Sequence, residues 1–394
     1  MIVSILGTSG AFKEGCKPQK NEEGEIRFQS ALYHGEILSK ESKAYKNSTE
    51  FLLQNYDDDF VFIGTKCAIK FQKIILKTSL KEKKVTYVEI EDDSLDDIFE
   101  KVLELLQEND ETLLDITHGF RHQPIMAIFA STLAQFLEKK SLKIIFAKEV
   151  QMFKEYRYIY LDEYIEITQI SLLLTGFIRT LNFVPVENMK LLNNKTFESF
   201  SKSLLSNDIK GVEKNYEALS KELERLKSHK ELQHISSLIE KVEKELSILN
   251  IFSVLSHFQK YILLSQITLD KNYLIIALSY LFESFREYCS YRFEKICQNI
   301  KFKDDYQRND HVMKTIGHFR EQNKILRRYP DMYHQNKEAF KQVNKLYNRL
   351  RKRRNALSHI NKTKNIQDMK NDLKGLILEV EALFNSKILS DLSY

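Results

Sequence analysis

The chain changes its sequence pattern near residue 165, and this change constrains the fold most strongly. Before it, short β-branched or apolar runs alternate with segments whose apolar residues recur every three or four positions, as in a parallel sheet covered by helices. After it, glycine becomes rare, no strand can be placed and the apolar spacing is helical. Because 394 residues suffice for two separate cores, we expect an α/β domain followed by an all-α domain.

The first part contains five runs with the length and composition of buried strands. They are residues 2–6, 60–63, 85–90, 112–116 and 142–146. Helical patterns separate the later runs, so each crossover has the form of a βαβ unit. Those patterns cover residues 67–80, 95–108 and 123–139. Residues 153–161 alternate aromatic and charged side chains, which predicts an antiparallel strand or a hairpin that closes the sheet edge. We expect a Rossmann-like, mostly parallel sheet over residues 1–165.

The remainder of the chain divides by composition into two helical parts. Residues 166–250 are expected to form a helical linker or insertion, because Lys and Glu alternate with leucines over residues 215–249 as in an antiparallel helical pair. Residues 251–394 are expected to form a separate all-α domain.

Composition limits the cellular setting and the partners. The net charge is only +5 with both signs mixed along the chain, so any nucleic-acid binding must come from local clusters. No apolar run is long enough to cross a membrane, which favours a cytoplasmic protein with no membrane partner. The cysteines show neither a CxxC pair nor a zinc-type spacing, so we expect no disulfide framework and no metal site. They are Cys16, Cys67, Cys289 and Cys297.

Small or hydroxyl residues follow three of the expected strands. They are Gly7, Thr8 and Ser9 after the first, Gly64 and Thr65 after the second, and Thr117, His118 and Gly119 after the fourth. Ligands of open α/β sheets bind outside the carboxyl ends of the strands, so these loops should meet at one edge. Any one loop alone could be an ordinary turn. Together, and without a GxGxxG or P-loop motif, they predict a nucleotide site of another kind.

The most specific string of this part runs from Asp115 to Pro124 (DITHGFRHQP). Thr117 and His118 supply hydrogen-bond donors, and Arg121 supplies a permanent cation. Asp115 is better interpreted as structural, because a carboxylate facing a polyphosphate would repel it. Pairing of Arg121 with a surface carboxylate remains the alternative for that residue.

With this string and Gly7-Thr8-Ser9-Gly10, the first 165 residues resemble the CARF domains of type III CRISPR systems. The resemblance implies a sensor of cyclic oligoadenylate. Cyclic tetra-adenylate is the first candidate, and a ring of six adenylates is the alternative. It also implies a homodimer or higher homo-oligomer, in which one ring lies across the twofold axis. The implied ligand contacts include Thr8, Ser9, Thr117, His118, Gly119 and Arg121.

A second motif lies in a basic segment near the C-terminus. There Arg354 is followed by Asn355, and four residues separate Arg354 from His359. In its helical context this RNxxxH string resembles the HEPN ribonucleases. Arg354 falls within an apolar stripe that contains Leu350, so a buried ion pair with a carboxylate such as Glu283 is the structural alternative.

The motif suggests metal-independent cleavage of single-stranded RNA by the 2′-hydroxyl. His359 would act as acid or base, Arg354 would stabilise phosphorane charge and Asn355 would orient either group. One straight helix cannot bring Arg354 and His359 together, so the site should form where the helix frays or between two copies. Neighbouring cations would bind the RNA backbone. They are Arg349, Arg351, Lys352 and Arg353.

The sequence therefore predicts an endoribonuclease of CRISPR antiviral defence that cyclic oligoadenylate activates allosterically and that needs no cofactor. The main alternative is a non-catalytic, nucleotide-responsive regulator whose helical half binds nucleic acid or protein. A small-molecule enzyme built on the α/β half alone ranks last, because that half lacks a nucleophile and base at the usual spacing.

Overall fold

The computed structural model describes most of the chain and divides it into two compact units. The described residues are 1–8, 12–13, 16–18, 20, 30–34, 43–80, 83–91, 94–137, 141–186, 189–316, 327–358, 365–386 and 389. The first unit contains Met1–Leu172 and Val186–Leu192, and the second contains Leu173–Pro185 and Asn193–Tyr394. The first is an α/β unit and the second is all-helical in its described part, so the predicted fold class is confirmed.

The described part of the first unit is built on a mixed sheet with the strand order β5-β4-β10-β9-β8-β1-β6-β7. From β9 to β7 the neighbours are parallel, whereas β10 is antiparallel to β9, parallel to β4, and β4 is antiparallel to β5. The strands are β1 (Ile2–Ile5), β4 (Ala31–His34), β5 (Ala44–Tyr45), β6 (Phe60–Gly64), β7 (Val85–Glu89), β8 (Glu111–Asp115), β9 (Ser141–Gln151) and β10 (Glu155–Tyr160). A separate hairpin joins β2 (Phe12–Lys13) to β3 (Lys17–Pro18).

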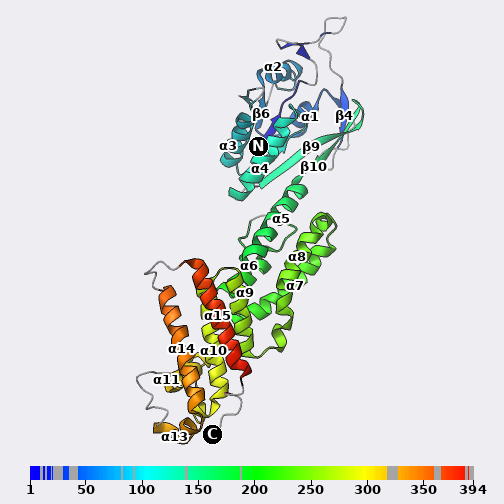
Figure 1. Ribbon diagram of the computed structural model, residues 1–394. Helices are drawn as coiled ribbons and strands as arrows, with labels where there is room; N and C mark the ends of the chain where they lie inside the picture. Colours follow the sequence, from blue (N-terminus) through cyan, green and yellow to red (C-terminus); the bar gives the residue numbers. More distant parts are fainter. Residues whose placement is uncertain are drawn as a thin grey trace. The chain divides into compact units, whose positions relative to one another are not determined.

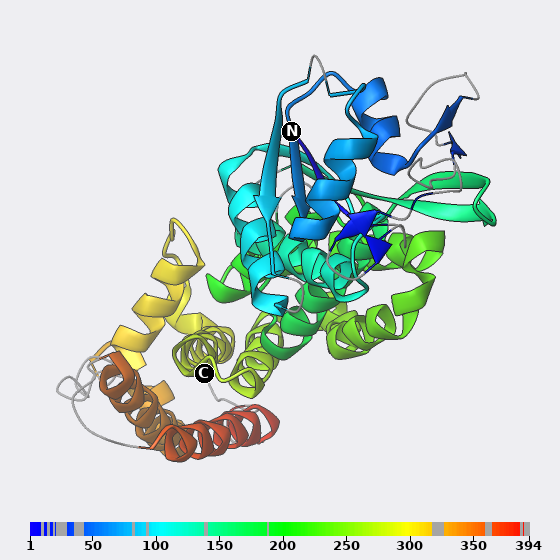
Figure 2. The ribbon, with the colours of Figure 1, turned by 90° about the horizontal axis from the view of Figure 1, so that it is seen from above.

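Helices cover both faces of this sheet (Figures 1 and 2). On one face Ile2, Phe60 and Phe62 pack with side chains of α1 (Ser48–Asn55) and α2 (Lys66–Ile75). The other face packs against α3 (Leu95–Glu108) and α4 (His122–Leu137). Alternate residues of each central strand are therefore buried on opposite faces, as a three-layer α/β/α arrangement requires.

The first helices begin directly after loops because polar side chains cap them. Asn47, Thr65 and Ser94 each accept a hydrogen bond from a backbone N–H in the first turn of α1, α2 and α3. Such caps satisfy amides that have no partner within the helix. This local chemistry places the start of α2 at the carboxyl end of β6, where the sequence predicts a ligand site.

The described part of the second unit is all-helical, and a large apolar core joins its helices from α9 to α15. Its core includes Leu281, Phe285, Val343, Leu350 and Val380, all buried. The helices described are α6 (Asn194–Leu205), α7 (Ile209–Ser228), α8 (Ser236–Leu246), α9 (His257–Asp270), α10 (Leu274–Arg292), α11 (Asp305–Ile316), α13 (Pro330–Gln335), α14 (Lys337–Ser358) and α15 (Ile366–Asn385), with 3-10 turns η1 (Lys230–Ile235), η2 (Ser247–Val254) and η3 (Glu294–Cys297). Helix α5 (Asp162–Thr180) contains the division between the units.

Helices α6 to α8 belong to the second unit, although we expected residues 166–250 to form a separate segment. The Tyr280 hydroxyl donates to the carbonyl of Leu204 at 2.7 Å. Lys260, almost buried, pairs with Glu213 at 2.9 Å. These contacts connect α6 and α7 with α9 and α10 over distances in sequence that periodicity does not reveal. Among the described residues no helix is long and apolar enough to cross a membrane.

Candidate functional site

The loops after β1 and β8 meet at the carboxyl edge of the sheet, as predicted. A Cβ atom on Gly7 would lie 3.0 Å from the Gly119 nitrogen and 3.2 Å from the His118 Cβ. Gly119 has a φ of +103°, and a Cβ there would lie 2.7 Å from both Gln123 Oε1 and Ile5 Cγ2. Two glycines are therefore needed for the backbones to approach this closely.

Asp115 and Thr117 hold the β8 loop against the neighbouring strands. The buried Asp115 carboxylate accepts hydrogen bonds from Ser4 Oγ at 2.9 Å, from the Thr117 amide at 3.0 Å and from Thr117 Oγ1. The Thr117 hydroxyl also accepts from the Ala147 amide of β9 at 2.9 Å. Burial raises the pKa of Asp115, against the opposing effect of these hydrogen bonds. The geometry supports the structural interpretation of Asp115 and shows that the Thr117 hydroxyl is occupied on both sides.

His118 and Arg121 are the side chains of this loop with unused hydrogen-bonding capacity. Burial lowers the pKa of His118, so its imidazole is neutral near pH 7. Its Nε2 atom is buried and has no hydrogen-bond partner among the described residues. Arg121 is exposed, and no described carboxylate lies within ion-pair distance of it. These two groups can serve a ligand without first breaking a described interaction.

Two glutamines that the sequence analysis missed shape the same edge. Gln72 of α2 is fully buried and donates to the Gly7 carbonyl at 3.1 Å. Gln123 is also buried, and its Oε1 accepts from the Phe120 amide at 3.0 Å. A glutamine on the buried face of a helix is an unusual choice and could have marked these positions. The sequence alone did not show which helix faces are buried at this edge.

The remaining predicted ligand contacts differ in how the fold uses them. The Thr65 hydroxyl caps α2 by accepting from the Ala68 amide at 3.4 Å, and the side chain is buried. Gly64 is needed for packing, since a Cβ there would lie 2.8 Å from the Leu6 Cβ. Thr8 is half-buried at the end of the described loop. Ser9 lies outside the described residues.

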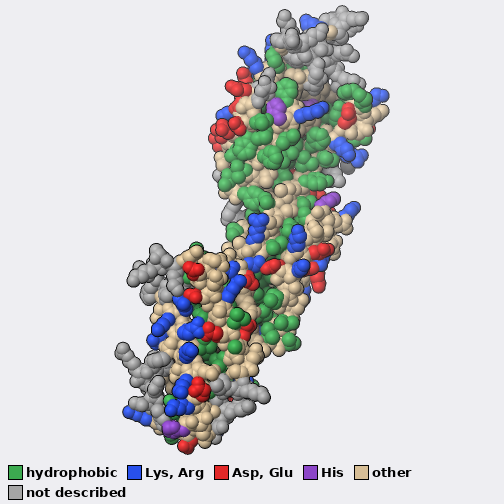
Figure 3. Space-filling view, viewed as in Figure 1, with side chains coloured by type: hydrophobic (Ala, Val, Ile, Leu, Met, Phe, Trp, Pro, Cys, Tyr) green, Lys and Arg blue, Asp and Glu red, His purple; other side chains and the backbone are tan. Residues whose placement is uncertain are grey.

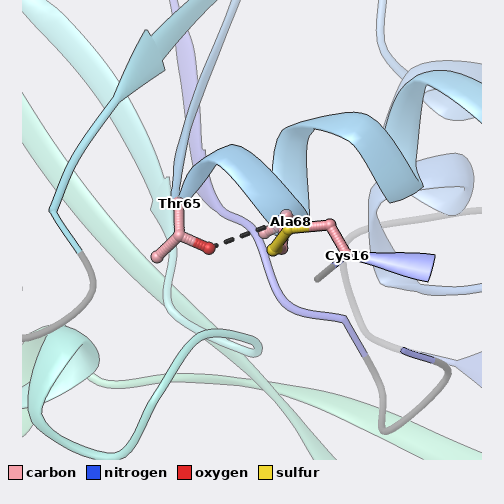
Figure 4. The surroundings of a disulfide bond; sticks show 4 residues. Cys16, Thr65 and Ala68 are labelled. Atoms are coloured by element: carbon pink, nitrogen blue, oxygen red, sulfur yellow. Dashed lines mark hydrogen bonds between the residues drawn. A yellow bond between two sulfur atoms is a disulfide. The ribbon is translucent and has the colours of Figure 1, made fainter. Parts of the chain in front are cut away.

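A disulfide bond joins Cys16 to Cys67 beside the Thr65 cap (Figure 4). Their Cα atoms lie 5.1 Å apart, within the normal range for a disulfide. Our expectation of no disulfide was therefore wrong. A separation of 51 residues carries no sequence signal for pairing, because only the packing of residue 16 against α2 brings the two sulfur atoms together.

In the second unit, α14 carries Arg354 and Asn355 at exposed positions near its end. The Arg354 guanidinium lies over the Phe282 ring of α10, with its carbon 4.6 Å from the ring centre. Leu350, one turn earlier, is fully buried. The structural alternative, a buried ion pair of Arg354 within the apolar stripe, is not observed, because the stripe passes out of the core before residue 354. His359 lies outside the described residues.

Glu283, the expected partner of Arg354, forms its ion pair with Arg286 at 2.9 Å. Burial raises the pKa of Glu283, and the positive charges of Arg286 and, more weakly, Arg354 lower it in part. Arg354 is therefore close enough to influence this carboxylate electrostatically while its guanidinium stacks on Phe282. Such a stacked and exposed cation can turn toward a phosphate at little cost.

The basic residues around Arg354 do not behave as one surface. Arg349 pairs with Glu379, and Arg353 pairs with Asp372 at 2.8 Å. No described carboxylate lies within ion-pair distance of Lys352, which is exposed. The unpaired cations are therefore better placed than the paired ones to bind an RNA backbone.

One further polar cluster contains potential metal ligands that their sequence positions did not reveal. Ligand atoms of His257, Glu287 and Asp305 lie within 4.8 Å of one another. Arg308 pairs with Glu287 at 3.0 Å and with Asp305 at 3.3 Å. Its guanidinium already neutralises the two carboxylates, so we assign this cluster to packing between α10 and α11.

Comparison with known protein families gives a match within the first unit. Residues 20–153 match the family model of the CARF domain of the CRISPR system endoribonuclease Csx1. No curated protein matches the chain. The matched range falls within the α/β unit and includes β8, its loop and α4. Within these residues, the first unit is therefore similar to a CARF domain.

Proposed function

We propose that the protein is an endoribonuclease that binding of cyclic oligoadenylate to its α/β unit activates. The observation that carries the proposal is the free hydrogen-bonding capacity of His118 and Arg121 at the edge of a unit that matches a CARF domain. Phosphodiester oxygens of the messenger would accept from Arg121, and adenine nitrogens would bond the neutral His118. The close-packed glycine loops would let the ring approach the backbone.

We further propose that two copies pair through α4. Large apolar side chains follow the β8 loop and continue along this helix, each between 38% and 58% exposed. They are Phe120, Ile125, Phe129, Leu133, Phe136 and Leu137. Figure 3 shows hydrophobic side chains gathered over α4. A stripe of this kind is unusual on a monomer. Pairing through it would bring two copies of the adjoining loop toward one ring-shaped ligand.

In the second unit, Arg354, Asn355 and His359 would cleave single-stranded RNA. The 2′-hydroxyl oxygen attacks the adjacent phosphorus, its proton passes to a base, and the bond to the 5′-oxygen breaks as that oxygen receives a proton. The products are a 2′,3′-cyclic phosphate and a 5′-hydroxyl. His359 would transfer a proton, Arg354 would stabilise the phosphorane oxygens and Asn355 would orient the phosphate. This donor set supplies charge stabilisation and proton transfer without a metal ion.

The test is an RNA cleavage assay with and without a panel of cyclic oligoadenylates. We expect cleavage to rise with one ring size, to persist in EDTA and to leave cyclic phosphate ends. A 2′-deoxy nucleotide at the cleaved position should block the reaction. Messenger binding without cleavage under any condition would instead support a non-catalytic regulator, and strict dependence on a divalent ion would contradict the mechanism.

The dimer has its own test in sedimentation of the full-length chain. Phe129→Asp places a charge in the middle of the α4 stripe and should convert dimers to monomers. Leu378→Asp, at an exposed apolar position of α15 in the second unit, serves as the matched control. An unchanged mass in Phe129→Asp would contradict pairing through α4.

A further inference from the structure

A groove runs along one side of α14 in the second unit, next to α13. It has a volume of about 480 Å³. Its lining consists of Tyr333, Phe340, Lys341, Asn344, Lys345, Asn348, Arg349 and Lys352. Four cations, two amides and two aromatic rings therefore line it, and no carboxylate does. The groove is distinct from the RNxxxH motif, because the motif begins at Arg354, beyond the last lining residue, Lys352.

A second groove of α14, which adjoins the first, provides an internal comparison. It lies toward α15, has a volume of about 670 Å³ and includes Glu338 and Glu379 in its lining. These carboxylates pair with Lys341 and Arg349. Lys341 and Lys345 line both grooves, so the two differ in charge because this groove adds two carboxylates whereas the first adds Arg349 and Lys352. Charge thus distinguishes two surfaces of similar size on one helix.

The cations of the first groove are spaced along one helix face. Lys341, Lys345, Arg349 and Lys352 follow each other at intervals of four, four and three residues, so they share a face. From first to last they extend about 16 Å along the helix. No described carboxylate lies within ion-pair distance of Lys345 or Lys352. A single phosphate needs only one such cation, whereas a row suits the backbone of a strand.

The uncharged lining residues offer contacts that bases can use. The Oδ1 atom of Asn344 is buried and has no hydrogen-bond partner among the described residues. Tyr333 is half-buried, and its ring lies 5.6 Å from the buried Phe340 ring. Aromatic rings beside a row of cations are typical of sites for single-stranded nucleic acids, where bases stack while cations follow the backbone.

We propose that this groove binds a single-stranded segment of the RNA substrate adjacent to the cleaved bond. The proposal rests on the ribonuclease function proposed above and names where its substrate is held. An acidic peptide would satisfy the cations, but it would leave the Asn344 acceptor and the Tyr333 ring without a specific role. The groove therefore extends the site from Arg354 toward the start of α14 and should favour substrates longer than a few nucleotides.

Binding tests the proposal independently of cleavage. The probe is a fluorescent 12-nucleotide RNA whose 2′-O-methyl groups block transesterification, titrated against the full chain at several salt concentrations. The double variant Lys345→Ala, Lys352→Ala should bind roughly ten-fold more weakly near 0.15 M salt, with the log–log salt slope reduced by about 1.4. Lys374→Ala, an exposed lysine of α15, is the control and should bind as wild type does.

A second measurement compares long and very short substrates. With messenger present, the double variant should lose roughly ten-fold in kcat/KM on a long RNA. Most of that loss should disappear on a trinucleotide that reaches only the reacting bond. Tyr333→Ala should raise the dissociation constant of the 12-nucleotide RNA by about five-fold or more, because the loss of one base stack costs at least about 1 kcal/mol. Tyr333→Phe should restore it, because a phenyl ring still stacks.

The outcomes separate the groove from the nuclease activity. Groove-dependent RNA binding without any cleavage would support the groove and overturn the proposed ribonuclease. Normal cleavage and affinity in the double variant would overturn the groove and leave the ribonuclease standing. Binding of poly-glutamate at least as tight as that of RNA, lost in the same variant, would reject RNA as the occupant.

Discussion

The two candidate sites differ in how firmly the fold holds their side chains. At the sheet edge, Asp115 is buried and accepts hydrogen bonds from Ser4 and Thr117, and Thr117 is bonded in turn to β9. At the end of α14, Arg354 is exposed and touches an aromatic face without a described ion pair. Hydrogen bonds therefore hold the β8 loop of the first site in place without a ligand. The second still has freedom to rearrange.

This difference suits the proposed coupling of a messenger sensor to a nuclease. A preorganised binding site loses little conformational entropy when a ligand binds, so more of the interaction energy remains available to shift an equilibrium. A loosely held catalytic group allows such a shift to change its geometry. Substitutions should therefore have separable effects, on stability and messenger affinity in the first unit and on catalysis in the second.

The largest expected effect is on catalysis, at the loosely held site. Arg354→Ala and His359→Ala should each reduce RNA cleavage by about 10² to 10⁴-fold, because each removes charge stabilisation or proton transfer. For Arg354 the loss of stability should stay near 1 kcal/mol or less, since only an exposed cation–π contact is removed. Single-turnover cleavage and thermal unfolding of the same variants measure both quantities.

Lys374→Ala, which removes an exposed cation of α15 in the same unit, serves as the control for nonspecific charge loss. It should retain most of the activity. If Arg354→Ala destabilised the chain as much as a core substitution and left cleavage intact, Arg354 would be a structural residue and the contrast between the sites would disappear.

The second effect is on stability and should be confined to the first unit. The Cys16–Cys67 disulfide spans 51 residues, and cross-links of that size stabilise by about 4 kcal/mol in the chain-entropy model. A thiol reductant should therefore increase hydrogen exchange in α1 and α2 but not in α14, as measured by mass spectrometry. Cys67→Ser should abolish this sensitivity, and Cys297→Ser, which removes a free thiol, should preserve it.

Equal changes in both units on reduction would show that the disulfide does not act locally. No change in either unit would contradict a stabilising role for the bond.

The position of the first site was predictable from sequence because topology determines it. Parallel strands place their carboxyl ends at one edge, so Gly7 and Gly119 had to approach each other once the strands were identified. The occupied hydroxyl of Thr117 was not predictable, because its second partner is Ala147, 30 residues away on β9. The same holds for the disulfide, which depends on where residue 16 packs.

The helical unit shows a different limit. The RNxxxH spacing located α14, and the apolar stripe through Leu350 was correctly predicted as buried. The exposure of Arg354 depends on how far the core extends along α14 and on Phe282 of a different helix. Periodicity describes the faces of one helix but not where its neighbours end. The basic groove beside α14 likewise depends on the packing of α13.

A third prediction compares two residues of the β8 loop. Arg121→Ala should raise the messenger concentration for half-maximal activation by roughly ten-fold or more, because a charge-assisted hydrogen bond is worth about 1.5 to 3 kcal/mol. It should leave stability unchanged, since Arg121 is exposed. Thr117→Ala should instead cost about 1 kcal/mol of stability, with a smaller change in messenger affinity. Calorimetric titration and thermal unfolding measure the two effects.

The opposite pattern, with Thr117 setting affinity and Arg121 setting stability, would reverse our assignment of the two side chains. Unchanged binding in both variants, and in a His118 variant, would reject the messenger site at this edge.

The smallest expected effect is a pH dependence of stability that originates at His118. Burial lowers its folded-state pKa, so below about pH 6.5 the unfolded chain binds more protons at this residue than the folded chain does. Its contribution is therefore present above that pH and is lost as the pH falls toward the lowered value, with a slope of at most about 1.4 kcal/mol per unit. Asp115 acts in the opposite direction, because burial raises its pKa and makes the folded state the better proton binder. His118→Gln should flatten the dependence between pH 5.5 and 6.5, whereas His234→Gln, at an exposed position of the second unit, should leave it unchanged. The measurement is urea unfolding followed across that range, and an unaltered slope in His118→Gln would mean that burial at the sheet edge does not control this proton.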